Sequence, residues 1–298
     1  MRELDYQPNL SARRLRSNET KKPAIAFFWP IDYRTNILAS LLNAFQNSVK
    51  LLDFDCELIV QTYENDHIDQ HIDPYIKNNY NAILIGAASE KDLSYLETLP
   101  VQIPSVLINR TSEKYSTICI DPQEIARIAV RLLQKKGYKE AAILASSKPY
   151  EATGQRTQAF LEECRRSKIL IRKEWILHDI GSIEGGARAA EAYSHLPDRP
   201  HCLFCEMDSM ALGAAYTLNR EHLNAPEDYE LLSIGMLEPS ITKYTSPPIS
   251  VIFLPNSKVM SIAVDMIVRS IRSNKNEPEH ILIQPELVLR ESFTLTKK

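Results

Sequence analysis

The chain has 298 residues, of which 44% are hydrophobic and 24% charged, an ordinary composition for a folded globular protein. The length predicts two globular units, or one large α/β unit split into two lobes, with a core that needs no disulfide or structural metal. The formal net charge of −3 excludes general binding of polyanions, so any contact with nucleic acid must come from a local basic element.

The cysteines and the N-terminal sequence predict a cytoplasmic protein. There are five cysteines, and an odd number placed mostly within apolar runs favours reduced thiols over a disulfide framework. Residues 1–23 are polar and lack the apolar core of a secretory signal. No apolar run approaches the roughly 20 residues needed to span a bilayer, so no membrane contact is expected.

The segment Pro8–Arg16 is a local basic element ahead of the first apolar run. Asn9 is a candidate N-cap for a helix of about two turns, which would be marginal in water without a partner. Arginines beside a projecting Leu15 suit the minor groove of DNA, where cations meet a narrow negative channel and an apolar wedge unstacks a base step. A solvated basic tail explains the same composition, so both interpretations stay open.

Short strands then alternate with segments of helical period. Strands of continuous apolar character separated by helices favour parallel sheets covered on both faces. The predicted strands of this first series are Ala24–Trp29, Glu57–Gln61, Ala82–Gly86 and Ser105–Asn109, and the predicted helices are 38–52, 68–77 and 93–96.

The helix predicted between residues 121 and 137 has explicit end signals. Asp121 is its N-cap, and Glu124 is expected to complete a capping box. Lys135 and Lys136 suit the negative end of the helix dipole, and Gly137 permits a left-handed terminating residue.

A second series of strands and helices follows and ends in a long β-rich stretch, 281–293. The two series together predict two parallel-sheet units, but periodicity does not show how they are connected. The predicted strands are 141–145, 171–177, 202–206, 231–235 and 249–254, and the predicted helices are 155–166, 184–194, 209–221 and 259–271.

Motifs for catalysis or metal binding are weak. Cys202 and Cys205 have the spacing of a redox pair or half a zinc site, but they stand in a buried-looking strand, so packing is the better interpretation. His67 and His71 lie one helical turn apart without the glutamate of a zinc-protease motif, which favours a solvated surface. The sequence has no glycine-rich phosphate loop and no nucleophile motif, so we expect neither an enzyme nor a cofactor.

Four stretches, in this order, resemble the lactose-repressor (LacI/GalR) family of transcription regulators. They are the hinge-like Leu4–Arg16, the strand-to-helix turn Phe204–Ala214, the following strand Pro226–Gly235, and the C-terminal Leu287–Ser292. The resemblance runs through nearly the whole chain, and its specificity comes from the order of the stretches.

The resemblance implies two doubly wound parallel-sheet lobes of the type I periplasmic-binding-protein class, with an effector between them. Open parallel sheets bind ligands outside the carboxyl ends of their strands, which agrees with that location. The lobes are expected to be joined by three crossovers, near residues 137, 253 and 284. The implied bounds are 1–21 for the hinge segment, 22–136 with 256–283 for the N-terminal lobe, and 137–252 with 284–298 for the C-terminal lobe.

The same resemblance implies a homodimer that binds operator DNA through paired hinge helices. In the family the helix-turn-helix precedes the hinge, and this chain begins inside the match, so alone it is expected to bind the operator weakly or not at all. The residues implied to lie at the DNA, with Leu15 as the intercalating wedge, are Pro8, Asn9, Ala12, Arg13, Leu15 and Arg16.

Arg156 stands where the family places an arginine that donates two hydrogen bonds to the effector. Its planar fork suits sugar hydroxyls or a carboxylate, although an exposed helix arginine is the alternative. The family's ligand turn usually reads Asn-Asp, whereas this chain has Met207-Asp208, and Asp208 could serve mainly as a helix cap. Leu237 replaces an aspartate of the sugar-binding members, so the effector, if a sugar derivative at all, is expected to be less polar or differently charged.

Three further residues are candidates for the effector site. Trp29 and Tyr33, after the first strand, could stack on the ligand, although Trp29 could instead belong to the core. Glu124 is the third. A DNA-binding repressor that senses a small molecule is the function these expectations favour. The alternative is the solute-binding protein of a transport system, which the polar N-terminus and the hinge-like segment oppose.

Overall fold

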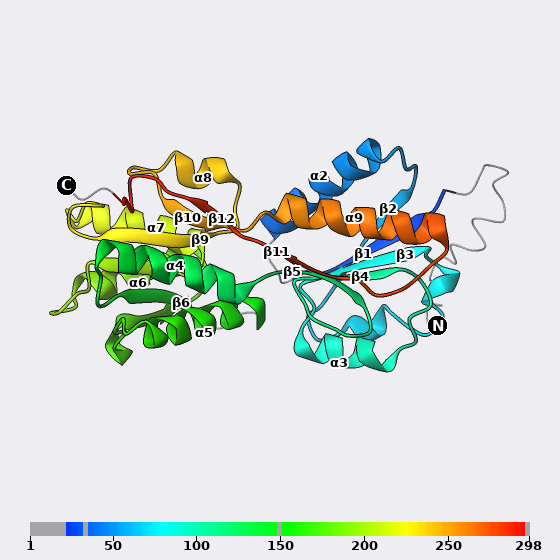
Figure 1. Ribbon diagram of the computed structural model, residues 1–298, viewed down its shortest axis with the longest axis horizontal. Helices are drawn as coiled ribbons and strands as arrows, with labels where there is room; N and C mark the ends of the chain where they lie inside the picture. Colours follow the sequence, from blue (N-terminus) through cyan, green and yellow to red (C-terminus); the bar gives the residue numbers. More distant parts are fainter. Residues whose placement is uncertain (1–21, 32–34, 148–150, 296–298) are drawn as a thin grey trace, which may run out of the picture. The chain divides into compact units, whose positions relative to one another are not determined.

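The computed structural model describes residues 22–31, 35–147 and 151–295, which form two compact units (Figure 1). The first unit comprises the chain through Cys119 together with Ser257–Ile281, and the second comprises Ile120–Asn256 and the chain from Leu282 onward. The chain therefore passes between the units three times. The predicted DNA contacts within Pro8–Arg16, and Tyr33, lie outside the described residues.

The first unit is a six-stranded sheet with its helices. Its strands are β1 (Ala24–Pro30), β2 (Glu57–Tyr63), β3 (Ala82–Gly86), β4 (Ser105–Ile108), β5 (Ser116–Ile120) and β11 (His280–Ile283), and its helices are α2 (Thr35–Leu51), α3 (Glu90–Thr98) and α9 (Asn256–Ser273). The strand order is β11-β5-β4-β3-β1-β2, with parallel pairing from β2 through β5. Because β1, β3 and β4 are buried along their whole length, they read as continuous apolar runs in the sequence.

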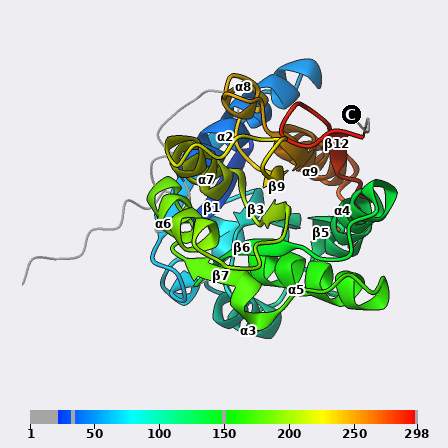
Figure 2. The ribbon, with the colours of Figure 1, turned by 90° about the vertical axis from the view of Figure 1, so that its left-hand side faces the viewer.

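The second unit repeats this plan. Its strands are β6 (Ala142–Ser146), β7 (Ile176–Asp179), β8 (Cys202–Cys205), β9 (Glu230–Gly235), β10 (Ser250–Phe253) and β12 (Glu286–Val288), and its helices are α4 (Pro122–Lys136), α5 (Glu151–Arg166), α6 (Ile183–Ser194), α7 (Asp208–Arg220) and α8 (Pro239–Lys243). The order is β12-β10-β9-β8-β6-β7, and all pairs are parallel except β10 with β12. Figure 2 shows α4 beside α5 and α6 beside α7. The two sheets confirm the predicted fold class.

Helix α4 begins and ends where its sequence predicts. The Asp121 carboxylate accepts a hydrogen bond from the backbone of Gln123 at 2.8 Å, and Gly137 closes the helix with a left-handed φ of 83°. The predicted capping box is wrong, because the Glu124 carboxylate accepts a hydrogen bond from Arg127 Nε at 2.6 Å instead.

The same helix belongs to the second unit, whereas the expected boundary near residue 137 placed it in the N-terminal lobe. It packs against α5 and β10, and its buried stripe includes Ile125, Ala129 and Leu133. The first crossing between units therefore precedes α4, between Cys119 and Ile120.

Residues 68–77 do not form the single helix that the sequence predicts. Two 3-10 turns stand there instead, η1 (Ile68–Gln70) and η2 (Ile76–Asn78). Pro74 separates them because it disfavours helical backbone at Asp73, whose side chain accepts a hydrogen bond from the backbone two residues later.

Three other elements differ from the prediction. The strand expected over 171–177 starts later, because η3 (Lys173–Trp175) is a 3-10 turn that precedes β7. Strand β5 and the five-residue helix α8 were not predicted. All three are short segments, where periodicity carries little information.

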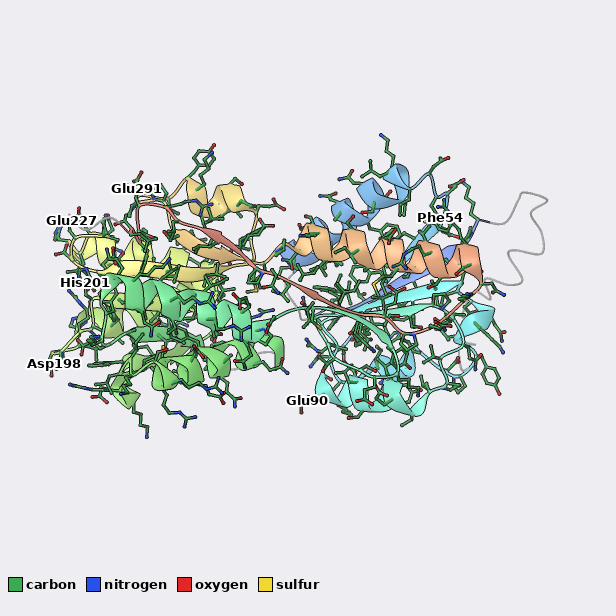
Figure 3. All side chains as sticks on the ribbon, viewed as in Figure 1. Phe54, Glu90, Asp198, His201, Glu227 and Glu291 are labelled. Carbon is green, nitrogen blue, oxygen red and sulfur yellow. The ribbon has the colours of Figure 1, made fainter. Side chains whose placement is uncertain are left out.

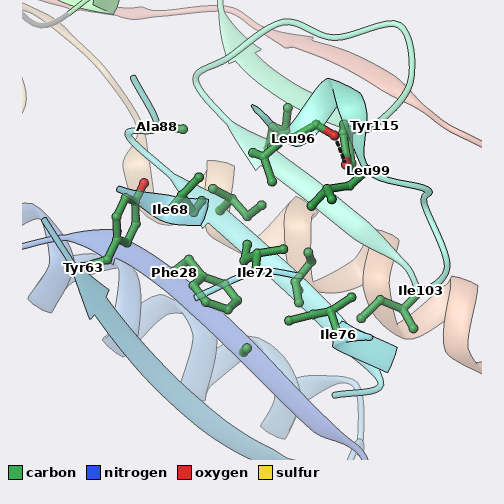
Figure 4. Packing of buried hydrophobic residues seen from close by; sticks show 14 residues of the cluster. Phe28, Tyr63, Ile68, Ile72, Ile76, Ala88, Leu96, Leu99, Ile103 and Tyr115 are labelled. Atoms are coloured by element: carbon green, nitrogen blue, oxygen red, sulfur yellow. Dashed lines mark hydrogen bonds between the residues drawn. The ribbon is translucent and has the colours of Figure 1, made fainter. Parts of the chain in front are cut away.

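The turns η1 and η2 cover an apolar cluster of the first unit (Figure 4). Ile68, Ile72 and Ile76 all point into it and are nearly inaccessible to solvent. The Tyr115 hydroxyl donates a hydrogen bond to the carbonyl oxygen of Leu96 at 2.7 Å, which satisfies its polar atom inside the cluster. Apolar residues spaced four apart therefore mark a buried face here, although the segment does not form an α-helix.

A buried ion pair lies at the amino-terminal edge of the second sheet, the end at which Figure 3 labels His201. Glu230, the first residue of β9, is 2% exposed and accepts hydrogen bonds from Lys136 Nζ at 2.8 Å and from the Tyr138 hydroxyl at 2.7 Å. Burial is the main cause that raises the pKa of Tyr138 well above its ordinary value, and the hydrogen bond to Glu230 raises it further. The hydroxyl therefore stays protonated and acts as a donor. The backbone of Thr294 also donates to Glu230, which fastens the C-terminal segment to the sheet.

We predict that Glu230→Ala lowers the free energy of unfolding by about 3–5 kcal/mol, because it leaves Lys136 largely buried without its carboxylate. Urea unfolding followed by circular dichroism measures this loss. Glu277→Ala, at an exposed position, is the matched control and should change stability by less than about 0.5 kcal/mol. Equal effects of the two variants would contradict a stabilising role for the pair.

Candidate functional site

Strands β6, β8 and β9 end at one edge of the second sheet, which we call the carboxyl edge. Strand β6 pairs with β7 on one side and with β8 on the other, so the switch point of this doubly wound sheet lies between β6 and β8. Open parallel sheets bind their ligands at this location. The residues that meet here, the carboxyl-edge cluster, are Arg156, Glu206, Met207, Asp208, Met236 and Leu237.

Asp208 ties the start of α7 to the loop that follows β9. Its Oδ2 accepts hydrogen bonds from the backbone of Met236 at 2.7 Å and of Leu237 at 2.6 Å, and its Oδ1 accepts one from Ser209 at 3.0 Å. The side chain is 1% exposed. The helix-cap interpretation is wrong in its detail, because Met207 is the N-cap residue and Asp208 is the first residue of the helix.

Arg156 is not an exposed helix arginine, as the alternative interpretation had it. It lies on α5, is 5% exposed, and places Nη1 3.5 Å from Met236 Sδ. A thioether is a weak acceptor for a charged donor. The structure thus brings Arg156, Met207, Asp208 and Leu237 to one edge, as the resemblance implies; whether they contact an effector stays a prediction.

Glu206 is a member of the cluster that sequence reasoning missed. It is 1% exposed, and its two carboxylate oxygens accept hydrogen bonds from the backbone of Ser146 at 2.8 Å and from the Thr157 hydroxyl at 2.7 Å. These contacts fasten the end of β6 and helix α5 to the end of β8. A charged residue directly after the buried strand Cys202–Cys205 was the available signal.

The loop after β7 packs against the carboxyl edge next to the end of β6. A Cβ built on Gly181 would lie 3.0 Å from Met207 Sδ and 3.3 Å from Ser146 Oγ, so this loop passes directly over both side chains. At the end of β7, the hydrogen bonds from Arg188, with a smaller one from the backbone of Ile180, hold the pKa of Asp179 below its ordinary value.

Helices α6 and α7 pack through glycines, which fixes where α7 begins. A Cβ on Gly213 would overlap the carbonyl oxygen of Ile183, and a Cβ on Gly186 would overlap that of Met210. The two backbones are therefore in direct contact. This contact sets the position of Met207 and Asp208, which open α7.

Gly213→Ala should destabilise the protein by about 1–3 kcal/mol, because the added methyl group overlaps backbone. In an ordinary helix interior the same change would stabilise by about 1 kcal/mol. Chemical unfolding measures the difference, with Asn219→Ala at an exposed position of the same helix as control. A Gly213→Ala variant as stable as the parent would refute the close contact.

In the first unit, the structure places Trp29 as the core interpretation has it. The side chain is 3% exposed, meets Phe27 edge-on with ring centroids 5.6 Å apart, and covers Gly86 so closely that a Cβ there would lie 2.6 Å from the ring. Sequence reasoning also missed Arg110, a 4% exposed arginine after β4 that donates hydrogen bonds to the carbonyl oxygens of Ala88 and Asn109.

The remaining candidates have structural partners. Glu124 pairs with Arg127 and, at 3.7 Å, with Arg131 on its own helix, and an effector role for it stays a prediction. Cys202 and Cys205 are fully buried, and burial raises the pKa of both thiols, which keeps them protonated and unreactive.

Metal-binding and membrane-spanning features are absent from the part of the chain that the structure describes. In residues 22–31, 35–147 and 151–295, no group of three or more histidine, cysteine or acidic side chains is placed to hold a metal. Among the described helices, none has both the length and the apolar character required to cross a bilayer.

The sequence of this chain is similar to a known domain family and to known proteins. Residues 131–293 match the family model of the periplasmic binding protein-like domain. The HTH-type transcriptional repressor PurR of Actinobacillus pleuropneumoniae serotype 3 is 25% identical over 297 residues, covering 98% of this chain and 87% of PurR. The ribose operon repressor of Haemophilus influenzae is 22% identical over 297 residues, covering 98% of this chain and 86% of that repressor.

Among solved structures, a LacI family transcription regulator from Clostridium acetobutylicum has 30% sequence identity and a TM-score of 0.86, covering 90% of this chain and 100% of that one. These similarities extend over both units.

Proposed function

The chain belongs to the LacI family of transcription regulators, and we propose that it represses transcription by binding operator DNA as a homodimer under the control of a small-molecule effector. The effector site that we propose is the carboxyl-edge cluster of the second sheet. The protein acts in the cytoplasm by binding and not by catalysis.

One observation carries the effector site: a buried arginine lies at the switch point of a doubly wound sheet. Arg156 is 5% exposed there, beside the loop that Asp208 fixes through two backbone amides. A guanidinium offers five N–H donors in a fixed plane and so orients a polar ligand group. The position of Arg156 at the switch point, where open parallel sheets bind ligands, supports this location.

Ligand control follows if the effector binds two conformations with different affinity. Binding then shifts the population toward the conformation it prefers, and the coupling equals that difference in affinity. An effector that contacts Arg156 would engage helix α5, which Glu206 connects to the end of β8. An effector that contacts Leu237 would engage the loop after β9, which Asp208 connects to α7. For the DNA contact, we propose that Pro8–Arg16 binds in the minor groove, with Leu15 as the wedge.

We predict that one compound in a panel of sugars, sugar phosphates, nucleosides and organic acids raises the thermal midpoint of unfolding. A ligand present at 100 times its Kd adds about 2.7 kcal/mol to the free energy of unfolding. Arg156→Gln should lower this stabilisation strongly at the same ligand concentration, whereas Arg166→Gln, at an exposed position of the same helix, should retain it. Retention by both variants would remove Arg156 from the site.

In the regulator, Leu15→Ala should weaken operator binding by about 10-fold or more while leaving the thermal midpoint unchanged, because the proposed wedge contacts base steps of the DNA. Fluorescence anisotropy with labelled operator DNA measures the affinity. Unchanged affinity would refute the wedge. Effector binding together with no retention of DNA from a random library would instead indicate a solute-binding protein.

A further inference from the structure

The carboxylates at the carboxyl edge are already engaged by the protein. Both oxygens of Glu206 and both oxygens of Asp208 accept hydrogen bonds from backbone amides or from a hydroxyl, at 2.6–3.0 Å. The Asp179 carboxylate accepts hydrogen bonds from Arg188 through both of its oxygens. Each carboxylate oxygen already accepts at least one of the hydrogen bonds it can take, so none of the three offers two wholly unengaged oxygens to clamp two neighbouring hydroxyls of a sugar.

The other side chains of the cluster add apolar surface. Met207 is 3% exposed, Met236 is 6% exposed and Leu237 is half-buried. Thioether sulfur is soft and polarisable and accepts hydrogen bonds weakly. Among the described residues, Arg156 brings a charged donor to this surface, with Nη1 3.5 Å from Met236 Sδ.

We propose that the effector is an organic carboxylate with an apolar body, and that its carboxylate replaces Met236 Sδ as the acceptor for Arg156 Nη1. This inference rests on the proposed effector function of the cluster. A carboxylate is a much stronger acceptor for a guanidinium than a thioether is, and it matches the planar fork of the guanidinium, so exchange of acceptor favours the bound state. The apolar body of the ligand then contacts Met207 and Leu237.

A singly charged carboxylate fits this edge better than a phosphate ester. Glu206, Asp208 and Asp179 bring negative charge to the same edge, and each like charge disfavours a dianion more than a monoanion. Two of these carboxylates are 1% exposed, where water screens their charge poorly.

The test is isothermal titration of the whole chain with matched ligands. The probes are straight-chain and aromatic carboxylic acids of two to eight carbons, their primary amides, neutral aldoses and sugar phosphates. The expected result is binding of at least one carboxylate at least 10-fold tighter than its own amide. Arg156→Gln should weaken that carboxylate by about 10- to 100-fold and the amide by less.

Met236→Leu separates a role in acceptor exchange from a general role in packing. It removes the sulfur but keeps the volume, so the carboxylate should bind with equal or higher affinity. Arg156→Lys keeps the charge but loses the planar fork and should fall between the parent and Arg156→Gln.

Three outcomes overturn the inference. A neutral aldose or a sugar phosphate that binds more tightly than every carboxylate overturns the ligand class and leaves the proposed regulator intact. A carboxylate whose affinity is unchanged in Arg156→Gln overturns the assigned contact. Failure of every probe to bind the parent chain counts against both this inference and the effector site itself.

Discussion

Two buried carboxylates on either side of Met207 hold the carboxyl edge of the second sheet together. Glu206 fastens the end of β6 and helix α5 to β8, and Asp208 fastens the loop after β9 to α7. Each is 1% exposed, and a carboxyl group buried this deeply needs hydrogen-bond partners, which the amide and hydroxyl donors provide. Loss of one donor would leave a buried charge under-satisfied, which makes the arrangement of these loops cooperative.

The glycine contacts of α6 and α7 extend this constraint away from the edge. Gly186 and Gly213 let the two helices touch backbone to backbone, so the start of α7 has little freedom to move independently of α6. Close-packed interiors do not deform continuously; they shift as bodies between discrete arrangements. A ligand at this edge therefore acts on the pair of helices together, and the hydrogen bonds of Asp208 connect that pair to the loop after β9.

Sequence reasoning succeeds where the signal is local. Helix α4 was predicted with its ends because Asp121 and Gly137 act through the backbone of their own helix, and the buried strands were predicted because parallel sheets need continuous apolar runs. It fails where a contact between residues far apart in the sequence determines the local structure. The carboxylate oxygens of Glu206 accept hydrogen bonds from Ser146 and Thr157, which are far away in the sequence, so the neighbouring residues do not reveal these contacts. Arg156 and Leu237 were found through family resemblance and not through any pattern of period or spacing.

The acceptors that stabilise the carboxyl edge also limit what it can recognise. A hydroxyl buried beside a methionine or a leucine loses its hydrogen bonds to water without replacement, at a cost of about 1–3 kcal/mol for each group. A neutral polyol carries several hydroxyls and would meet this cost repeatedly at Met207, Met236 and Leu237. A ligand with one concentrated charge needs one strong donor, and Arg156 supplies it. Selectivity for the ligand at this edge therefore has two sources. One is the donor Arg156, and the other is that the carboxylates of Glu206 and Asp208 already accept hydrogen bonds from the protein.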